Sequence, residues 1–507
     1  MSTPMMQSSF DPFAATIFAE HEWRAAPAAA KRDILDPATG ERVGAIAMTD
    51  LGTAAPILAR ARAAQPGWAA LDAKSRAGLL HRLADSIDGS GHRPVAELMV
   101  REMGKPYAEA VGELMNVAPI FRYFAELARD DGGQVAGSVS PGAAQYMRWF
   151  PYGASLHILP FNFPIILMAF TAAASLAAGN VIVIKPAEAT SLSTLRFMAH
   201  FRLLPPGVAT CLTGGAETAQ ALIRSPDIHA VAFTGSVEAA RKVAAACGEL
   251  LKPAVIEAGG NDPMIVMDTA PADIAAAAAV TAAFHLSGQI CTSAERFFVH
   301  DAIHDEFVTA MATRTRALKI GPGIGRSEIG PLVSEAARAK VMGLVEEALA
   351  KGAKLVCGGR VPAGFNSGWF YEPTILTGCR PDMAIMRTET FGPVAPICRV
   401  RDFEEAVRLA NDSRFGLGAS IYTTKLEEAM AAVERLEAGM VWVNNVLGDN
   451  DALPFGGWKL SGMGRALGRL GLNAFRQTKM VMMDPKPALQ DWWYPYGADF
   501  FAAREKL

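Results

Sequence analysis

Short apolar runs alternate with longer stretches of helical periodicity through the middle of the chain. The apolar runs, rich in β-branched residues, cover 156–159, 181–184, 208–212, 230–233 and 253–256. The stretches with helical pattern cover 165–178, 191–200, 217–223 and 236–246. Strands that alternate with helices predict βαβ crossovers and a parallel sheet. We therefore expect a doubly wound α/β unit over roughly 150–258, with helices from the first 130 residues packed around it.

A second α/β unit is expected in the following part of the chain. A helix should begin after Asp268-Thr269-Ala270-Pro271, because proline is favoured in a first helical turn. Further helical stretches, with strand candidates between them, cover 304–318, 335–350, 403–411 and 425–437. The unit should end near Ser461.

One segment raises the question of a membrane span. Between Arg148 and Lys185 there is no Asp, Glu, Lys or Arg, and this length could cross a bilayer. Pro160, Pro164 and the pair Gly179-Asn180 interrupt it, however, and a single helix does not continue through such residues. The pattern favours a buried strand, helix and strand, and no membrane partner.

Composition and charge narrow the function classes. The 507 residues are 51% hydrophobic and have a formal net charge of −3, which excludes a disordered chain and disfavours a nucleic-acid partner. The six cysteines form no Cys-x-x-Cys pair and no zinc-ligand spacing, so no metal is expected. Residues 1–20 contain no secretory signal pattern, and the cysteine usage favours the cytoplasm.

Polar residues follow each predicted strand of the first unit. They are Asn162, Lys185, Gly214-Gly215, Thr234-Gly235-Ser236 and Glu257. In an open parallel sheet the carboxyl ends of the strands share one edge, where ligands bind. Gly235-Ser236 also begins a helix, whose free N–H groups favour a phosphate.

These and further motifs resemble the aldehyde dehydrogenase superfamily, in its NAD(P)-dependent, non-phosphorylating, hydrolytic form. The motifs are Phe161-Asn162-Phe163-Pro164, Lys185-Pro186-Ala187-Glu188, Phe233-Thr234-Gly235-Ser236, Glu257-Ala258-Gly259-Gly260-Asn261, Gly288-Gln289-Ile290-Cys291, Glu389-Thr390-Phe391-Gly392-Pro393 and Pro454-Phe455-Gly456-Gly457. They occur in the order of that family, over nearly the whole chain.

The resemblance implies a domain plan. Residues 1–130 and 150–258 would form a Rossmann-like NAD-binding domain, and 259–461 an α/β catalytic domain. Residues 131–149 and 475–497 would form a small β oligomerisation element, followed by a tail at 498–507. The expected assembly is a homodimer or homotetramer.

The resemblance also assigns the chemistry. Cys291 would attack an aldehyde to form a thiohemiacetal, because a thiolate is a strong nucleophile near neutral pH. The Asn162 amide and the Cys291 backbone N–H would stabilise the oxyanion. After hydride transfer, Glu257 would act as the base that hydrolyses the thioester to the acid.

For the cofactor, the resemblance implies that Lys185 and Glu188 hold the adenosine ribose. A carboxylate there accepts a 2′-hydroxyl and repels a 2′-phosphate, so NAD is expected in preference to NADP. The remaining cofactor-binding residues would be Gly215, Gly235, Ser236, Glu389 and Phe391.

The substrate pocket expected from the same comparison contains Phe163, Leu167, Phe170, His285, Ile290, Thr292, Asp449 and Phe455. Semialdehyde enzymes of the family usually have Arg at the positions of Phe170 or His285, so an apolar or aromatic aldehyde is favoured. His285 is either a substrate contact or a core histidine, and Asp449 is a rim charge. The alternatives are a semialdehyde dehydrogenase that uses another basic group and a catalytically silent relative.

Two features depart from the family pattern. Thr171 and Ala466 occupy positions where many members have a Lys–Glu pair, so a proton relay to Glu257 would have to use water. The end of the chain contains six aromatic residues, at 492, 493, 494, 496, 500 and 501. These aromatic residues either cover the edge of their own oligomerisation strand or cross the subunit interface and form part of the wall of a neighbouring subunit's substrate entrance.

Overall fold

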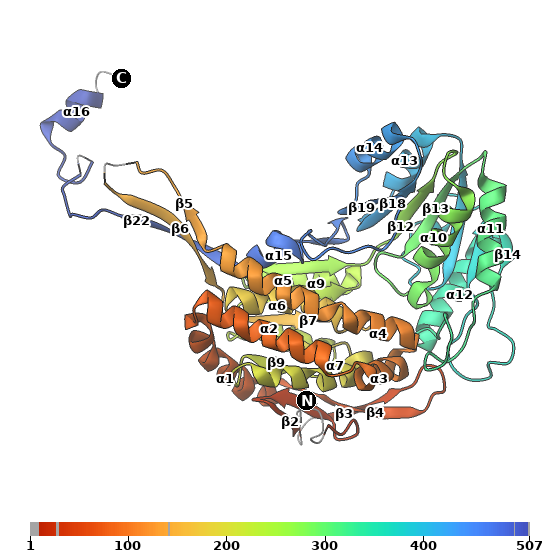
Figure 1. The fold of residues 1–507 in the computed structure, drawn as a ribbon, viewed down its shortest axis with the longest axis horizontal. Helices are drawn as coiled ribbons and strands as arrows, with labels where there is room; N and C mark the ends of the chain where they lie inside the picture. The colour runs from red at the N-terminus through yellow and green to blue at the C-terminus, as the bar shows by residue number, and fades with distance from the viewer. Residues whose placement is uncertain (1–9, 27–29, 140–141, 491, 505–507) are drawn as a thin grey trace.

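Two α/β units and a projecting antiparallel arm make up the molecule (Figure 1). The structure is a computed structural model that describes residues 10–26, 30–139, 142–490 and 492–504. Residues 1–9 and 505–507, the extremes of the expected NAD-binding domain and tail, lie outside the described residues.

The first unit contains an eight-stranded sheet in the order β2-β1-β9-β8-β7-β10-β11-β21, in which β21 is the short strand Gly462–Met463. Its five central strands are parallel: β7 (Ala154–Ile158), β8 (Val181–Lys185), β9 (Ala209–Cys211), β10 (Ala230–Gly235) and β11 (Ala254–Ala258). The strand order reverses between β7 and β10, which creates the crevice where doubly wound sheets bind ligands. The predicted doubly wound α/β fold is confirmed.

The crossover helices agree with the sequence pattern within a few residues. They are α6 (Ile166–Ala178), α7 (Ser191–Phe197), α8 (Ala216–Arg224) and α9 (Val237–Glu249). The helix expected over 191–200 ends earlier, at α7, and continues as a tighter 3₁₀ segment over Met198–Leu203. Ser236 caps α9, because its hydroxyl accepts from the N–H of Ala239.

The first 130 residues contain strands as well as the expected helices. β1 (Thr16–Ala19) and β2 (Glu22–Ala25) extend the first sheet beyond β9, and β3 (Ala30–Leu35) pairs with β4 (Arg42–Met48). The helices are α1 (Leu51–Ala70), α2 (Ala73–Gly89), α3 (Arg93–Met103), α4 (Tyr107–Met115) and α5 (Val117–Asp130). The expectation of helices alone was therefore incomplete here.

A buried ion pair fixes the start of α6. The Lys105 ammonium pairs with Glu113, and both side chains are fully buried. The other oxygen of Glu113 accepts from the N–H groups of Ile165 and Ile166, at 2.8 and 3.1 Å. A buried carboxylate needs such partners, because an unpaired buried charge is strongly destabilising. The pair therefore positions the turn that carries Asn162.

The second unit contains a seven-stranded sheet in the order β14-β15-β16-β13-β12-β18-β19. The strands are β12 (Asp262–Val266), β13 (Ala294–His300), β14 (Lys354–Cys357), β15 (Thr374–Thr377), β16 (Val394–Val400), β18 (Gly418–Tyr422) and β19 (Met440–Val443). The helices are α10 (Ala272–Phe284), α11 (His304–Arg316), α12 (Glu335–Ala350), α13 (Phe403–Asn411) and α14 (Leu426–Arg435). Consecutive residues of a strand point to opposite faces of the sheet, and Phe297 and Phe298 belong to two separate apolar clusters. Both faces of this sheet are therefore covered.

The long uncharged segment forms β7, α6 and β8 in the first unit. Every residue of β7 and β8 is buried, and so is α6 from Leu167 to Ala177. Among the described residues, no helix is long and apolar enough to cross a membrane.

The arm is a three-stranded antiparallel sheet of β5 (Gly133–Val135), β6 (Ala144–Pro151) and β22 (Arg476–Met483). Figure 1 shows it standing away from the two units, with α16 (Ala498–Arg504) beyond its tip. The short helix α15 (Gly468–Asn473) precedes β22. The domain boundaries given above stay predictions.

Candidate active site

A cleft of about 1060 Å³ opens where the strand order of the first sheet reverses. It is lined by all seven residues expected to bind a cofactor, which are Lys185, Glu188, Gly215, Gly235, Ser236, Glu389 and Phe391. Asn162, Glu257 and Cys291 line the same cleft. The structure thus brings the predicted catalytic and cofactor residues together.

A second cavity, of about 580 Å³, also reaches Cys291. All eight residues expected in the substrate pocket line it, namely Phe163, Leu167, Phe170, His285, Ile290, Thr292, Asp449 and Phe455. Cys291 therefore lines both the cleft and the cavity. The sulfur therefore lies where two ligands could meet.

Asn162 follows β7 and is buried. Its Nδ2 donates to the carbonyl of Gln289, at 2.9 Å. An amide nitrogen has two N–H bonds, so the second one remains to serve a ligand beside Cys291. The bond to Gln289 also ties this amide to the loop that contains Cys291.

Glu257 lies one residue before the end of β11, and its pKa differs from that of an exposed carboxyl. Oε2 accepts from the Thr234 hydroxyl at 3.2 Å. Burial raises the pKa of Glu257 to about 7, and the Cys291 thiol and Thr234 oppose this by hydrogen bonding. Burial and the facing Glu257 carboxylate raise the pKa of Cys291 well above that of a free thiol. At neutral pH the thiol is protonated and faces a group that can take its proton.

The buried carboxylate of Glu295, in β13, connects two loops to this strand. Oε1 accepts from the N–H of Phe391 at 2.7 Å, and Oε2 accepts from the N–H of Thr390 at 2.8 Å. Oε2 also accepts from Nδ2 of Asn261, at 3.0 Å. Burial raises the pKa of Glu295, and the nearby Glu389 adds to this effect. The sequence motifs did not reveal this residue, although a charged pair at the start of an apolar strand was an available indication.

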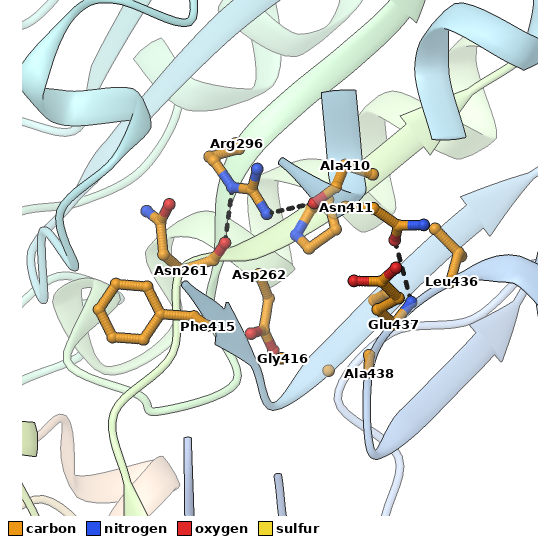
Figure 2. Close-up of a pocket in the computed structure, with 13 residues that line it drawn as sticks. Asn261, Asp262, Arg296, Ala410, Asn411, Phe415, Gly416, Leu436, Glu437 and Ala438 are labelled. Atoms are coloured by element: carbon orange, nitrogen blue, oxygen red, sulfur yellow. Dashed lines mark hydrogen bonds between the residues drawn. The ribbon is translucent and has the colours of Figure 1, made fainter. Parts of the chain in front are cut away.

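Arg296, the other half of that charged pair, holds the loop after β11 from the opposite side. Figure 2 shows its guanidinium donating to the carbonyls of Asn261, at 2.7 Å, and Ala410, at 2.9 Å. A third bond reaches the carbonyl of Leu409, at 3.2 Å. Arg296 thereby joins the loop after Glu257 to the end of α13.

At the far end of the cleft, Glu188 forms an ion pair with Arg32 of β3. Glu188 also lies against Gly215, where a Cβ atom would clash with its carboxylate. Burial lowers the pKa of Lys185 to about 8. Arg32 was not expected in this site, because it belongs to a hairpin that the sequence pattern did not predict.

The substrate cavity combines phenylalanine rings with a paired histidine. Phe170 and Phe455 pack edge to face, with ring centroids 5.3 Å apart. His285 Nδ1 lies 3.3 Å from Glu109, whose other oxygen accepts from the N–H of Leu286 at 3.0 Å. Burial lowers the pKa of His285 to about 4, so its ring is neutral. His285 thus lines the cavity and also has a partner within the protein.

The family model for aldehyde dehydrogenases matches residues 23–481. This chain belongs to the aldehyde dehydrogenase family, a family of oxidoreductases.

The proteins similar to this chain are named for different aldehyde substrates. The chain is 34% identical over 489 residues to betaine aldehyde dehydrogenase of Bacillus subtilis, covering 94% of this chain and 99% of the relative. It is 35% identical over 464 residues to glutarate-semialdehyde dehydrogenase of Pseudomonas putida, covering 91% and 96%. The crystal structure of an E. coli enzyme described as NADP dependent superimposes with a TM-score of 0.90 at 33% identity, covering 93% of this chain and 98% of that one.

We predict that Glu295→Gln destabilises the protein, because an amide cannot accept all three hydrogen bonds. A buried donor that loses its hydrogen-bond partner costs about 1–3 kcal/mol. Denaturant unfolding would measure this loss, with the exposed Glu249→Gln as the control. A Glu295→Gln protein with an unchanged free energy of unfolding would show that the two loops are held by other contacts.

Proposed function

We propose that this protein oxidises an aldehyde to the carboxylic acid with NAD, through a thiohemiacetal and a thioester on Cys291. The observation that carries the proposal is the convergence of Cys291, Asn162 and Glu257 where the cleft and the cavity meet. A thiol, an amide donor and a carboxyl with a pKa near neutrality are the groups that this reaction needs.

The first step forms a bond between sulfur and carbon. The Cys291 sulfur attacks the carbonyl carbon while its proton passes to Glu257, and the carbonyl electron pair moves to oxygen. The free N–H of Asn162 and the backbone N–H of Cys291 stabilise that oxyanion. The nicotinamide of bound NAD supplies a hydride acceptor, and loss of hydride leaves a thioester.

The second step is hydrolysis. Glu257, once it has released the first proton to solvent, takes a proton from a water molecule that attacks the thioester carbon. The carbon–sulfur bond then breaks, and the acid and the Cys291 thiolate separate. Because the base must be ionised, the hydrolysis rate should rise with pH through the pKa of Glu257, about 7.

We infer an apolar or aromatic aldehyde as the substrate class. Phe163, Phe170 and Phe455 supply apolar surface in the cavity. Of the described residues that line it, none is Lys or Arg, so a distal carboxylate on the substrate would lack a cationic partner. The pair of His285 and Glu109 carries no positive charge at neutral pH, and Lys105, the partner of the lining residue Glu113, is fully buried in its own ion pair.

Replacement of Glu257 should separate the two steps. We predict that Glu257→Gln forms NADH slowly in a first turnover and then stalls at the thioester, because no base activates water. Cys291→Ala should abolish NADH formation and keep cofactor binding. Stopped-flow absorbance at 340 nm would follow both variants. An unchanged steady-state rate in Glu257→Gln would remove Glu257 as the hydrolytic base.

The choice of cofactor can be tested at Glu188 and Arg32. Glu188 favours NAD by repelling a 2′-phosphate, whereas Arg32 offsets part of that repulsion. Glu188→Ser should reduce the ratio of kcat/KM for NAD to kcat/KM for NADP more than tenfold, which corresponds to about 1–2 kcal/mol. Arg32→Ala should lower kcat/KM for NADP. Measurement of kcat/KM with NAD and with NADP, in the wild type and in both variants, tests these two expectations. A wild-type preference for NADP would contradict the assignment.

We further propose that the arm joins copies of this chain into a homodimer or homotetramer. Val135, Met480 and Met482 expose 86%, 76% and 59% of their surface on it. Trp492 and Trp493 beyond β22 are also exposed in the single chain, and clustered apolar exposure marks an interaction surface.

Truncation after Asp484 should therefore reduce assembly or stability, since the aromatic area would no longer be buried. Sedimentation velocity would measure assembly, and an aldehyde panel would measure selectivity. A truncated oligomer with altered KM for aldehydes supports a tail that reaches a neighbour's substrate entrance. Unchanged selectivity would leave the tail as a cover for its own strand, and unchanged mass and stability would contradict both roles.

A further inference from the structure

A small cavity of about 20 Å³ adjoins Glu257, apart from the cleft and the substrate cavity. Thr171, Thr234 and Glu257 supply polar side chains to its lining, and apolar residues such as Phe455 and Ala466 supply most of the rest. This volume is enough for one water molecule, which needs two to four polar partners. The cavity lies where the family pattern has a charged pair at positions 171 and 466.

One oxygen of Glu257 lacks a partner. Oε2 accepts from Thr234 and the Cys291 thiol faces the carboxylate, but Oε1 is buried and has no hydrogen-bond partner of its own among the residues that the structure describes. An unsatisfied buried carboxylate oxygen is costly, so native structures provide a protein group or an ordered water. The adjoining cavity is a place for such a water.

Thr171 is held by a buried chain of hydrogen bonds. Its hydroxyl bonds to Nδ1 of His157 at 2.8 Å, and Nε2 of His157 bonds to the hydroxyl of Ser155, also at 2.8 Å. Ser155 in turn bonds to the hydroxyl of Ser175, at 2.7 Å. Burial lowers the pKa of His157 to about 3, so the whole chain is uncharged. Its members fix the orientation of the Thr171 hydroxyl.

We propose that Thr171 is a positioning residue that holds a water molecule against Oε1 of Glu257, with His157 fixing its hydroxyl. This proposal rests on the proposed function, in which Glu257 is the hydrolytic base. The hydrogen-bonded chain ends at Ser155 and Ser175, which are fully buried. It therefore orients the carboxylate, and the proton leaves Glu257 through the cleft.

An uncharged support also affects the acidity of Glu257. The ionisable groups that face Glu257 are Cys291, Asp449 and Glu389, which are neutral or negative. Thr171 and His157 add no positive charge, so nothing from this side lowers the pKa as a lysine would. The base thus keeps a pKa suited to catalysis near neutral pH.

The test is the pH profile of thioester hydrolysis in variants at position 171, measured in the steady state and in single turnovers. Thr171→Val keeps the shape and removes the hydroxyl. It should slow hydrolysis about tenfold and move the acid limb to higher pH, because the carboxylate loses its water. The first-turnover NADH burst should keep its amplitude. Thr171→Ser should restore the profile.

Thr171→Lys provides an independent test, since a cation beside Glu257 should move the acid limb of the pH profile to lower pH. Thr315→Val is the matched control, because Thr315 is a buried helical threonine of α11 whose hydroxyl bonds to the carbonyl of Met311. It should leave the profile unchanged.

A wild-type profile in Thr171→Val, or a Thr171→Ser protein as slow as Thr171→Val, would overturn the inference. If Thr171→Val does not fold, the Thr171→Lys variant tests the inference instead. An acid limb of Thr171→Lys that does not move to lower pH would overturn the inference. The proposed function fails separately, when Glu257→Gln hydrolyses at the normal rate. A stalled Glu257→Gln with an unshifted Thr171→Val would contradict the role of Thr171 alone.

Discussion

The geometry of the site depends on one buried carboxylate, that of Glu295. Its two oxygens accept from Thr390, Phe391 and Asn261, which lie on two separate loops. Asn261 leads back to Glu257, and Glu295 itself follows Cys291 by four positions along the chain. The proposed base, the proposed nucleophile and the wall of the cleft are thus all connected to Glu295. Because a buried network of hydrogen bonds is strong when every member has a partner and costly when one does not, this arrangement is rigid.

Burial also determines the protonation states on which the chemistry depends. The pKa values of Glu257 and Cys291 are both raised, so each group keeps its proton to a higher pH than an exposed group would. A raised carboxyl pKa makes Glu257 a better base, while a raised thiol pKa makes Cys291 depend on that base. The two residues therefore work as a pair.

Much of the first unit could be predicted from the sequence, because parallel strands buried on both faces appear as plain β-branched runs. Asn162, Lys185 and Glu257 could be placed at one edge for the same reason. Glu295 and Arg296 could not, since their partners are mainly backbone groups, which leave no trace in residue identity. Arg32 and the hairpins before α1 were missed because their short strands are partly polar and show no clear alternation.

The position of Cys291 between two separately lined spaces has a consequence for the order of events. The cleft and the cavity meet at this residue but share little else of their walls. A bound dinucleotide therefore does not obstruct the approach of an aldehyde, and an aldehyde does not obstruct the dinucleotide. In the proposed reaction neither ligand has to arrive first for steric reasons, and the reduced dinucleotide can depart while the acyl group is still attached to sulfur. Its departure opens a way for water to reach the carbon that must be hydrolysed.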